Sequence, residues 1–372
     1  MTSPSPRVRL VDVARVAGVS KTTVSDALNG TGRLPAATRE HVREVARGLG
    51  YRPNATARRL RAGRTRLLGL AAREYVCSPW VYAELAYFSQ LTTAVTRTAL
   101  EHGYGVVLLP TAAPDDCWLD MPLDGVFVID PVAGDPLVAD FLSAGVPVVS
   151  DRRALEEAAA RAREAGGTSG DGTAGTRPAR WLDFDYERAT LDVLDHLREQ
   201  GAERIALVTA RSTSCFFERS GEAYGRWCAQ NGRVPVSVAT DAPGPAHVLA
   251  AVETVFSASA SASGPASAAG SPDALLVLTE VSPPLLLDAL RRLGRSVPDD
   301  LLVVCATEDP AAAYTDPGMS TLGYLPVESA RAGVELLVDA IEGRPGPDGR
   351  LFGARLEVRA SSLAAGARRR TR

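Results

Sequence analysis

The chain has 372 residues and a net charge of −3, with 45% hydrophobic and 23% charged residues, which is ordinary for a soluble globular protein. This length allows two or three domains with cores of their own, and no apolar run approaches the roughly 20 residues of a membrane helix. The first residues contain no apolar segment typical of a signal peptide, and the five cysteines form no CxxC pair. These features argue against a membrane protein and against a disulfide or zinc framework, and they predict a cytoplasmic protein.

Basic residues concentrate in the N-terminal segment. The residues before Leu67 include 14 Lys or Arg and four Asp or Glu, a net charge of +10, so the rest of the chain carries −13. A small basic segment joined to an acidic remainder indicates that the phosphates of a nucleic acid bind to the N-terminal segment alone. A basic disordered tail is the alternative, which the helical periodicity of this segment disfavours.

Three short helices are predicted at the start of the chain. Gly18 ends the first helix, Ser20 is a suitable N-cap for the second, and Gly50 ends the third. A turn containing glycine between two short helices is what a helix-turn-helix requires. The predicted shared core consists of Leu10, Val13, Ala14, Ala17, Thr23, Val24, Ala27, Leu28, Val42, Val45, Ala46 and Leu49.

The second helix presents short polar side chains away from this core. Lys21 and Thr22 lie at its start, and Ser25 and Asp26 follow one turn later. Side chains near a helix N-terminus can reach base edges in the major groove, and the N-terminus itself binds phosphate. The alternative is that these residues form only the polar face that any amphipathic helix has.

Residues 51–66, YRPNATARRLRAGRTR, form an arginine-rich segment that is either a linker or a short helix. As a helix, this segment carries Ala57 and Leu60 on one face, with Arg58 beside them. A leucine flanked by arginines can enter the minor groove and kink DNA.

Three N-terminal segments resemble the DNA-binding domain of the lac repressor family (LacI/GalR type) of bacterial transcription regulators. These segments are VDVARVAGVSKTTVSDALNG, LGYRPN and ATARRLRAG, in the family's order and spacing. The resemblance implies that Lys21 and Thr22 read bases and that Leu60 belongs to a hinge helix that enters the minor groove. The DNA-binding residues that it implies are Lys21, Thr22, Thr23, Ser25, Asp26, Thr38, Tyr51, Asn54, Ala57, Arg58 and Leu60.

Asp26 departs from the family pattern, because many members have Arg at this position. An Arg there reads guanine, whereas Asp can accept a hydrogen bond from cytosine N4 and repels phosphate. Asp26 therefore either changes the operator sequence or points at an Arg of the same domain, and the sequence leaves both open.

After Leu67, short apolar segments alternate with helical ones, which predicts two α/β lobes, each an open sheet with helices on both faces. The predicted strands are 67–71, 106–109, 126–129, 146–149, 205–209, 274–278 and 301–304. The predicted helices are 87–102, 136–144, 187–200, 218–230, 246–256, 284–293 and 327–341. The low-complexity stretches 156–179 and 257–272 are predicted to be surface loops without a chemical role.

The same region is similar to the family's two-lobed effector domain, which itself resembles periplasmic sugar-binding proteins. LDGVFVIDP and DPLVADFLSAGVPVVSDR match the first lobe, and LDFDYERATLDVLDHLREQGAERIALVT, PDALLVLTE and VPDDLLVVCATED match the second. The resemblance implies a helix-turn-helix DNA-binding domain at 7–53, a hinge at 54–66, and an effector-binding and dimerisation domain at 67–372. The first lobe is then expected at about 67–181 and 324–345, and the second at about 182–323 and 346–372.

The family binds a small effector, often a sugar or a nucleobase, in the cleft between these lobes. The effector-binding residues implied by position are Phe88, Trp181, Phe184, Asp185, Arg219, Glu280 and Thr307. Thr279-Glu280 stands where the family often has Asn-Asp, and Thr307 where it often has Asp. Either the effector is not an ordinary sugar, or no small effector binds. Trp181 and Phe184 could instead belong to a core between the lobes.

These features together predict a DNA-binding transcription regulator, a repressor that binds a palindromic operator as a homodimer. A small molecule in the cleft is expected to change its affinity for DNA, as inducer or as corepressor. The alternative is a ligand-binding receptor of the periplasmic-binder type without a transcription role. An enzyme is not expected, because the chain has no GxxxxGK[ST] motif and no GxSxG motif, and HGYGVV, residues 102–107, lacks the third glycine of a dinucleotide-binding motif. No cofactor or metal is expected either.

Overall fold

The computed structural model describes residues 8–29, 32–51, 64–73, 81–110, 117–131, 135–152, 179–212, 214–261 and 270–364. The chain divides into two compact units, residues 1–66 and 67–372, which we term the head and the body. None of the described helices is long and apolar enough to cross a lipid bilayer.

The head contains three short helices, α1 (Leu10–Ala17), α2 (Lys21–Asn29) and α3 (Ala36–Gly48), as the sequence predicts. Gly18 follows α1 in the left-handed conformation, with φ at +67°, where a side chain would be strained. Each helix contacts the other two. Their apolar faces form one buried core, which consists of Val13, Ala14, Ala17, Val24, Ala27, Val42 and Ala46.

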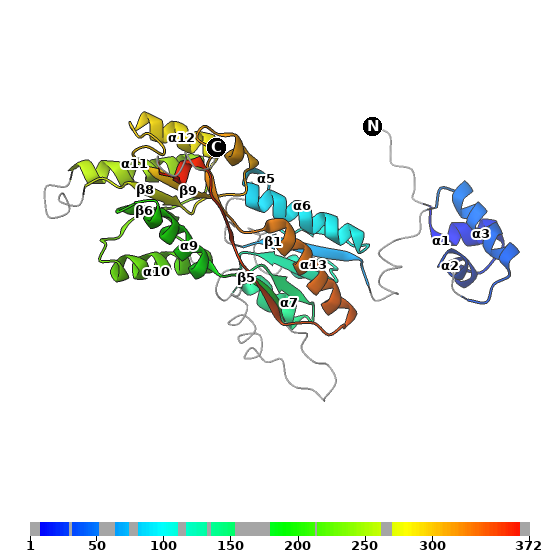
Figure 1. The fold of residues 1–372 in the computed structure, drawn as a ribbon. Helices are drawn as coiled ribbons and strands as arrows, with labels where there is room; N and C mark the ends of the chain where they lie inside the picture. Colours follow the sequence, from blue (N-terminus) through cyan, green and yellow to red (C-terminus); the bar gives the residue numbers. More distant parts are fainter. Residues whose placement is uncertain are drawn as a thin grey trace. The chain divides into compact units, whose positions relative to one another are not determined.

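The first lobe of the body is a six-stranded parallel sheet in the order β11-β5-β4-β3-β1-β2 (Figure 1). Helices α6 (Ala86–Glu101) and α13 (Pro326–Glu342) pack together on one face of it. Helix α7 (Pro136–Ser143) covers the other face, and the short helix α5 (Val81–Glu84) precedes α6. The strands are β1 (Leu67–Ala72), β2 (Gly105–Leu108), β3 (Gly125–Ile129), β4 (Val148–Ser150), β5 (Arg180–Phe184) and β11 (Gly349–Phe352).

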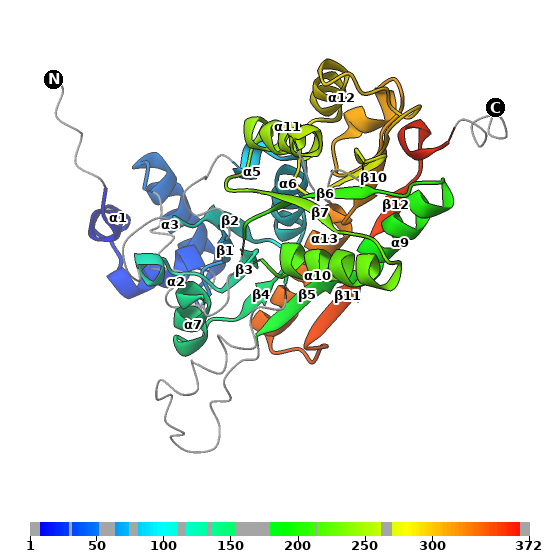
Figure 2. The same ribbon diagram turned by 90° about the vertical axis from the view of Figure 1, so that its left-hand side faces the viewer.

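The second lobe is also a six-stranded sheet, in the order β12-β10-β9-β8-β6-β7, in which only β12 is antiparallel. Figure 2 shows α11 and α12 on one side of this sheet and α9 and α10 on the other. The strands are β6 (Ile205–Ala210), β7 (Val236–Thr240), β8 (Ala274–Val277), β9 (Leu302–Ala306), β10 (Ser320–Gly323) and β12 (Arg355–Glu357). The helices are α9 (Tyr186–Glu199), α10 (Cys215–Gln230), α11 (Pro245–Ser261) and α12 (Pro283–Arg292).

The chain passes between the two lobes three times: after β5, between β10 and α13, and between β11 and β12. In a parallel sheet, the carboxyl ends of the strands share one edge, and ligands of open α/β sheets bind outside that edge. Residues that directly follow β3, β6 and β9 line a single cavity, namely Asp130, Arg211 and Thr307. The carboxyl edges of both sheets therefore face one cleft.

The structure changes the lobe boundaries predicted from sequence. The predicted first segment of the first lobe ends at residue 181, but β5 continues in the first sheet to Phe184. Residues 346–352, expected in the second lobe, include β11, which pairs in parallel with β5. Edge strand β11 is largely exposed, so its sequence GRLF contains no apolar run that would indicate a strand. The strands β5, β7, β10 and β12 were likewise not predicted.

Gly333, in the middle of α13, is required by the packing of this helix on the first sheet. A Cβ atom at residue 333 would lie 2.2 Å from the Phe127 ring and 2.8 Å from Leu182 Cδ1. We expect Gly333→Ala to lower the free energy of unfolding by about 1–3 kcal/mol, because overpacking outweighs the helix propensity of alanine. Chemical denaturation of the full chain measures this change.

Gly225, inside α10, provides the matched control, because a Cβ atom there meets nothing within 4 Å. Gly225→Ala should raise stability by roughly 0.5–1 kcal/mol. If Gly333→Ala were as stable as the wild-type chain or more stable, the close packing of residue 333 against Phe127 and Leu182 would be contradicted.

Candidate functional site

The N-terminus of α2 in the head is capped by the residue that the sequence predicts. Ser20 Oγ accepts a hydrogen bond from the Thr23 backbone N–H at 3.0 Å and lies 2.8 Å from Thr23 Oγ1. Lys21 and Thr22 on the same turn are exposed, whereas Val24 and Ala27 are buried. The cap thus fixes the first turn of α2 with Lys21 and Thr22 accessible to a partner.

The other residues assigned to DNA binding occupy several environments. Ser25, Asp26 and Thr38 are partly buried, and Tyr51 packs against the core of the head. Asn54, Ala57, Arg58 and Leu60 lie outside the described residues. The described part of the head therefore presents Lys21 and Thr22 as its most accessible base-reading candidates.

Asp26 points toward the turn that leads to α3. Its Oδ2 lies 2.8 Å from the position that a Cβ atom of residue 32 would occupy, and Gly32 has a left-handed φ of +72°. The carbonyl of Gly32 accepts a hydrogen bond from Arg39 Nη2 at 3.3 Å. The Asp26 carboxylate therefore lies beside the turn between α2 and α3.

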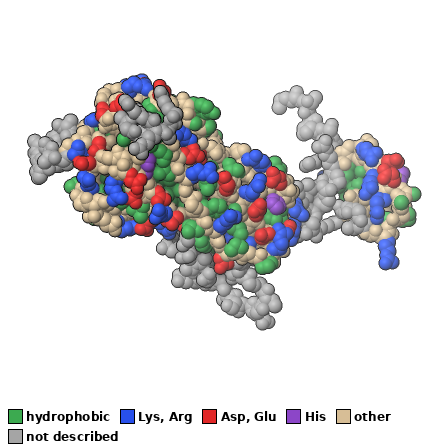
Figure 3. Space-filling view, viewed as in Figure 1, with side chains coloured by type: hydrophobic (Ala, Val, Ile, Leu, Met, Phe, Trp, Pro, Cys, Tyr) green, Lys and Arg blue, Asp and Glu red, His purple; other side chains and the backbone are tan. Residues whose placement is uncertain are grey.

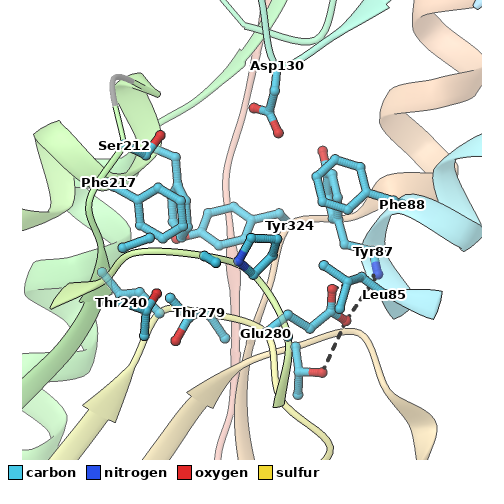
Figure 4. A pocket seen from close by; sticks show the side chains of 18 of the residues that line it. Leu85, Tyr87, Phe88, Asp130, Ser212, Phe217, Thr240, Thr279, Glu280 and Tyr324 are labelled. Atoms are coloured by element: carbon cyan, nitrogen blue, oxygen red, sulfur yellow. Dashed lines mark hydrogen bonds between the residues drawn. The ribbon is translucent and has the colours of Figure 1, made fainter. Parts of the chain in front are cut away.

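The cleft of the body encloses about 690 Å³ and receives side chains from both lobes (Figure 4). The first lobe contributes Leu85, Tyr87 and Phe88 at the start of α6, together with Asp130 and Arg152 after β3 and β4. From the second lobe and its crossover come, among others, Arg211, Ser212, Phe216, Phe217, Thr240, Asp241, Thr279, Glu280, Thr307, Glu308 and Tyr324.

A buried polar network forms the first-lobe wall of the cleft. Asp130 and Arg152 form an ion pair in which their side chains are 2% and 9% exposed. The Asp130 backbone N–H donates to Asp151 Oδ1 at 2.6 Å, and the Tyr87 hydroxyl donates to Asp151 Oδ2 at 3.4 Å. Burial, followed by the charge of Asp130, raises the pKa of Asp151 to about 7. The Arg152 guanidinium also lies 5.4 Å from the ring centroids of Tyr186 and Phe216.

Two glutamates form the opposite, second-lobe wall. Glu280 accepts hydrogen bonds from the Tyr87 backbone N–H, with Oε1 at 3.1 Å and Oε2 at 3.3 Å. Glu308 accepts one from the Tyr324 backbone N–H at 2.5 Å. Burial raises the pKa of each glutamate to about 7, against the lowering effect of these backbone donors. Both carboxylates are therefore held by backbone N–H groups rather than by guanidinium groups.

Aromatic rings join the points where the chain crosses between the lobes. The Tyr324 ring lies 5.4 Å from Phe184, 5.6 Å from Tyr186 and 5.2 Å from Phe216, centroid to centroid. Phe352 packs on Phe184 at 5.7 Å. Phe184, Tyr324 and Phe352 lie at the three crossovers, so the cluster connects the lobes where the chain passes between them.

Several hydroxyl groups of the cleft have no hydrogen-bond partner within the described structure. They belong to Thr240, Thr279 and Tyr324, which are 4%, 7% and 8% exposed. A buried polar group without a partner is costly, so these hydroxyls are suited to bind a ligand. Among the described residues, no group of three or more His, Cys, Asp or Glu is placed to hold a metal ion.

The structure brings only some of the predicted effector residues together. Phe88, Glu280 and Thr307 line the cavity. The other predicted residues have structural contacts elsewhere. Asp185 caps α9 by accepting from the Arg188 backbone N–H at 3.0 Å, and Arg219 donates to Asp183 at 3.1 Å.

Two aromatic residues of the predicted set also lie away from the cavity lining. Trp181 lies directly against Gly349 of β11, and Phe184 is buried in the aromatic cluster. Phe184 thus lies in the core between the lobes that the sequence left open, whereas Trp181 packs within the first lobe. The lining residues Tyr87, Asp130 and Arg152 were not predicted, although the last two follow predicted strands and that position was a usable signal.

Two segments of the chain match known families. Residues 9–54 match the bacterial regulatory proteins of the lacI family, and residues 194–362 match the periplasmic binding protein-like domain. The first match covers the three helices of the head, and the second covers most of the second lobe together with α13 and β11.

Curated relatives are transcription regulators. The chain is 29% identical to the HTH-type transcriptional regulator RafR of Escherichia coli, over 55% of this chain and 56% of RafR. It is 28% identical to AglR of Rhizobium meliloti, over 60% and 59% of the two chains. It is 25% identical to the HTH-type transcriptional repressor MelR of Bacillus subtilis, over 91% and 93%. The chain thus spans little more than half the length of RafR and AglR.

Solved structures with this fold include regulators with ligands. The lac repressor dimer bound to operator and the anti-inducer ONPF is similar with a TM-score of 0.72 and 20% identity, over 96% of this chain and 100% of that chain. The transcriptional regulator CelR in complex with cellobiose is similar with a TM-score of 0.59 and 23% identity, over 95% and 100%. At these identities, the likeness establishes the fold.

The raised pKa of Asp151 makes stability depend on pH. Because its pKa of about 7 in the folded chain lies above the ordinary value of 3.8, the carboxyl group stabilises the fold fully below about pH 4 and loses this contribution as the pH rises through 7. We expect the free energy of unfolding to fall between about pH 5 and pH 8, and to fall less in Asp151→Asn. Denaturant titrations at both pH values measure the difference.

Asp192→Asn, which removes a surface carboxylate paired with Arg188, is the control. Its free energy of unfolding should fall between about pH 5 and pH 8 by as much as that of the wild-type chain. A fall of the same size in Asp151→Asn and in the wild type would contradict the burial of Asp151 as an uncharged group.

Proposed function

We propose that this chain, which belongs to the lacI family of bacterial regulatory proteins, is a sequence-specific DNA-binding transcription regulator that acts as a repressor in the cytoplasm. The observation that carries the proposal is the first turn of α2, where the Ser20 cap leaves Lys21 and Thr22 exposed above a three-helix core. Side chains at this place in a helix-turn-helix reach base edges in the major groove. A ligand receptor without a transcription role does not account for the head.

The proposal includes a homodimer and the hinge expected from sequence at residues 54–66, of which only 64–66 are among the described residues. A single small head presents few base-reading side chains, whereas two heads related by a two-fold axis double the contacts on a palindromic site. The lac repressor, with the same fold, is a dimer bound to its operator.

The charges of the cleft disfavour a negatively charged ligand. Arg152 is paired with Asp130, and Arg211 Nε lies 2.6 Å from Asp241 Oδ1 at the exposed rim. Glu280 and Glu308 line the same cavity, so an anionic ligand would meet carboxylates and guanidinium groups that already have partners. We infer that the ligand carries no negative charge.

The remaining lining indicates the ligand's other properties. Phe88 and Phe216 supply aromatic faces, and Thr240, Thr279 and Tyr324 supply hydroxyls. An apolar ring face combined with several hydroxyl partners suits an uncharged polyhydroxylated molecule, such as a sugar. The similar regulator CelR is in complex with cellobiose. A ligand that prefers one arrangement of the lobes would then shift the population that binds DNA.

The DNA-binding proposal is tested by selecting bound sequences from a random double-stranded DNA pool at near-physiological salt. We expect a palindrome of two half-sites, because a dimer imposes its symmetry on the site. Lys21→Ala should weaken binding to the selected site by about tenfold or more and relax the preference at one position of each half-site.

Arg188→Ala removes a surface charge of the body and should leave operator affinity unchanged. Recovery of unselected DNA with steeply salt-dependent binding would mean that the head is only a basic patch. Equal effects of the two substitutions would exclude Lys21 as a base-reading residue.

The ligand proposal is tested by the melting temperature of the chain in the presence of neutral sugars and of their phosphorylated forms. A neutral sugar at about 100 times its Kd should add about 2.7 kcal/mol to the free energy of unfolding. At pH 8, above the pKa of about 7 of both Glu280 and Glu308, the phosphorylated form should stabilise much less, because the ionised carboxylates repel it. Greater stabilisation by the phosphorylated form would overturn the charge assignment.

A further inference from the structure

Helix α6 begins at the cleft without a cap from its own segment. Leu85 is its N-cap residue, and no side chain at this position accepts a hydrogen bond from the first turn. The first N–H groups of a helix have no partner within the helix and need an acceptor from elsewhere. The partner in this case comes from the other lobe of the body.

Glu280 supplies that acceptor across the cleft. It follows β8 in the second lobe, and its two carboxylate oxygens accept from the Tyr87 N–H of the first lobe at 3.1 Å and 3.3 Å (Figure 4). The two residues are 193 positions apart in the chain. A carboxylate at a helix N-terminus is also favoured by the helix dipole and by the charge-assisted hydrogen bond.

A second hydrogen bond links the same part of α6 to the second lobe. Gln90 Nε2 donates to the backbone carbonyl of Glu308 at 2.8 Å, one turn after Tyr87. Tyr87 and Phe88 line the cavity, and α6 is packed against α13. Any change in the angle between the lobes must therefore break the bond between Glu280 and α6 or move α6 against the first lobe.

We propose that Glu280 links the two lobes across the cleft and that its carboxylate excludes ligands that carry a negative charge. Its carboxylate occupies the N-terminus of α6, which would otherwise bind an anionic group of a ligand. A ligand that enters the cleft changes the lobe arrangement by acting on this bond. The regulatory part of this inference rests on the proposed function, whereas the bond itself and its effect on anions do not.

The bond is tested by amide hydrogen exchange of the full chain without ligand. Glu280→Ala should increase the exchange rate of the Tyr87 amide by about tenfold or more, and Glu280→Gln by less, while Thr98 later in α6 stays unchanged. Glu253→Gln, at an exposed position of α11 in the same lobe, is the matched control and should change nothing. An unchanged exchange rate of the Tyr87 amide in Glu280→Ala would overturn the proposal. Faster exchange throughout α6 would also overturn it, because the substitution would then destabilise the whole helix rather than remove one hydrogen bond.

Inorganic phosphate tests the charge assignment without knowledge of the natural ligand. At constant ionic strength, phosphate should restore protection of the Tyr87 amide in Glu280→Ala and should have no effect in the wild-type chain. Failure of phosphate to protect Tyr87 in this variant would overturn the view that Glu280 occupies an anion site.

Operator affinity tests the regulatory part. Glu280→Ala should change the Kd for the selected operator by at least about threefold, with Glu253→Gln unchanged. Altered Tyr87 exchange with unchanged operator affinity would overturn the regulatory part alone. A wild-type chain that selects no operator would instead refute the proposed function, and the exchange result would still decide whether the bond exists.

Discussion

The carboxyl edges of two parallel sheets face each other because the chain crosses between the lobes three times. Side chains that follow parallel strands collect at this edge, so each sheet delivers polar residues to the same cavity. The first sheet brings Asp130 and Arg152, and the second brings Thr279, Glu280 and Thr307. The cleft is thus a consequence of strand direction and chain path, and the aromatic cluster around Tyr324 connects the lobes at the crossings.

Buried carboxylates in this cleft are balanced in two different ways. Asp130 is paired with Arg152, which also contacts aromatic rings. Glu280 and Glu308 instead accept hydrogen bonds from backbone N–H groups at the starts of α6 and of the crossover to α13. Buried charges of this kind contribute little net stability, because desolvation offsets the attraction. They fix the arrangement of the lobes instead, because the start of α6 and the crossover to α13 are hydrogen-bonded to glutamate side chains of the second lobe.

Sequence periodicity was sufficient for the head and for the central strands. Apolar residues at helical spacing and the Ser20 cap located α1 to α3, and continuous apolar runs located β1, β3, β6, β8 and β9. Periodicity did not reveal β5 and β11. Strand β5 contains two buried charged residues, so it has no continuous apolar run. Arg180 donates to the Leu336 carbonyl, and Asp183 accepts from the Phe184 backbone N–H. Strand β11 is an exposed edge strand.

The site was harder to predict than the fold, because its contacts join residues far apart in the chain. Of the residues to which the family resemblance pointed, Phe88, Glu280 and Thr307 line the cavity, whereas the side chains of Asp185 and Arg219 have other partners. The bond between Glu280 and the start of α6 has no local sequence signal. It depends on the angle between two lobes, which only the folded chain defines.

If ligand binding in the cleft changes operator binding by the head, reciprocal binding measurements detect this coupling directly. The operator Kd would be measured with and without an uncharged ligand that raises the melting temperature, and the ligand Kd with and without operator. We expect both constants to change by the same factor, on the order of five- to 150-fold. A ligand that saturates the cleft and leaves operator affinity unchanged would show that the cleft does not regulate DNA binding.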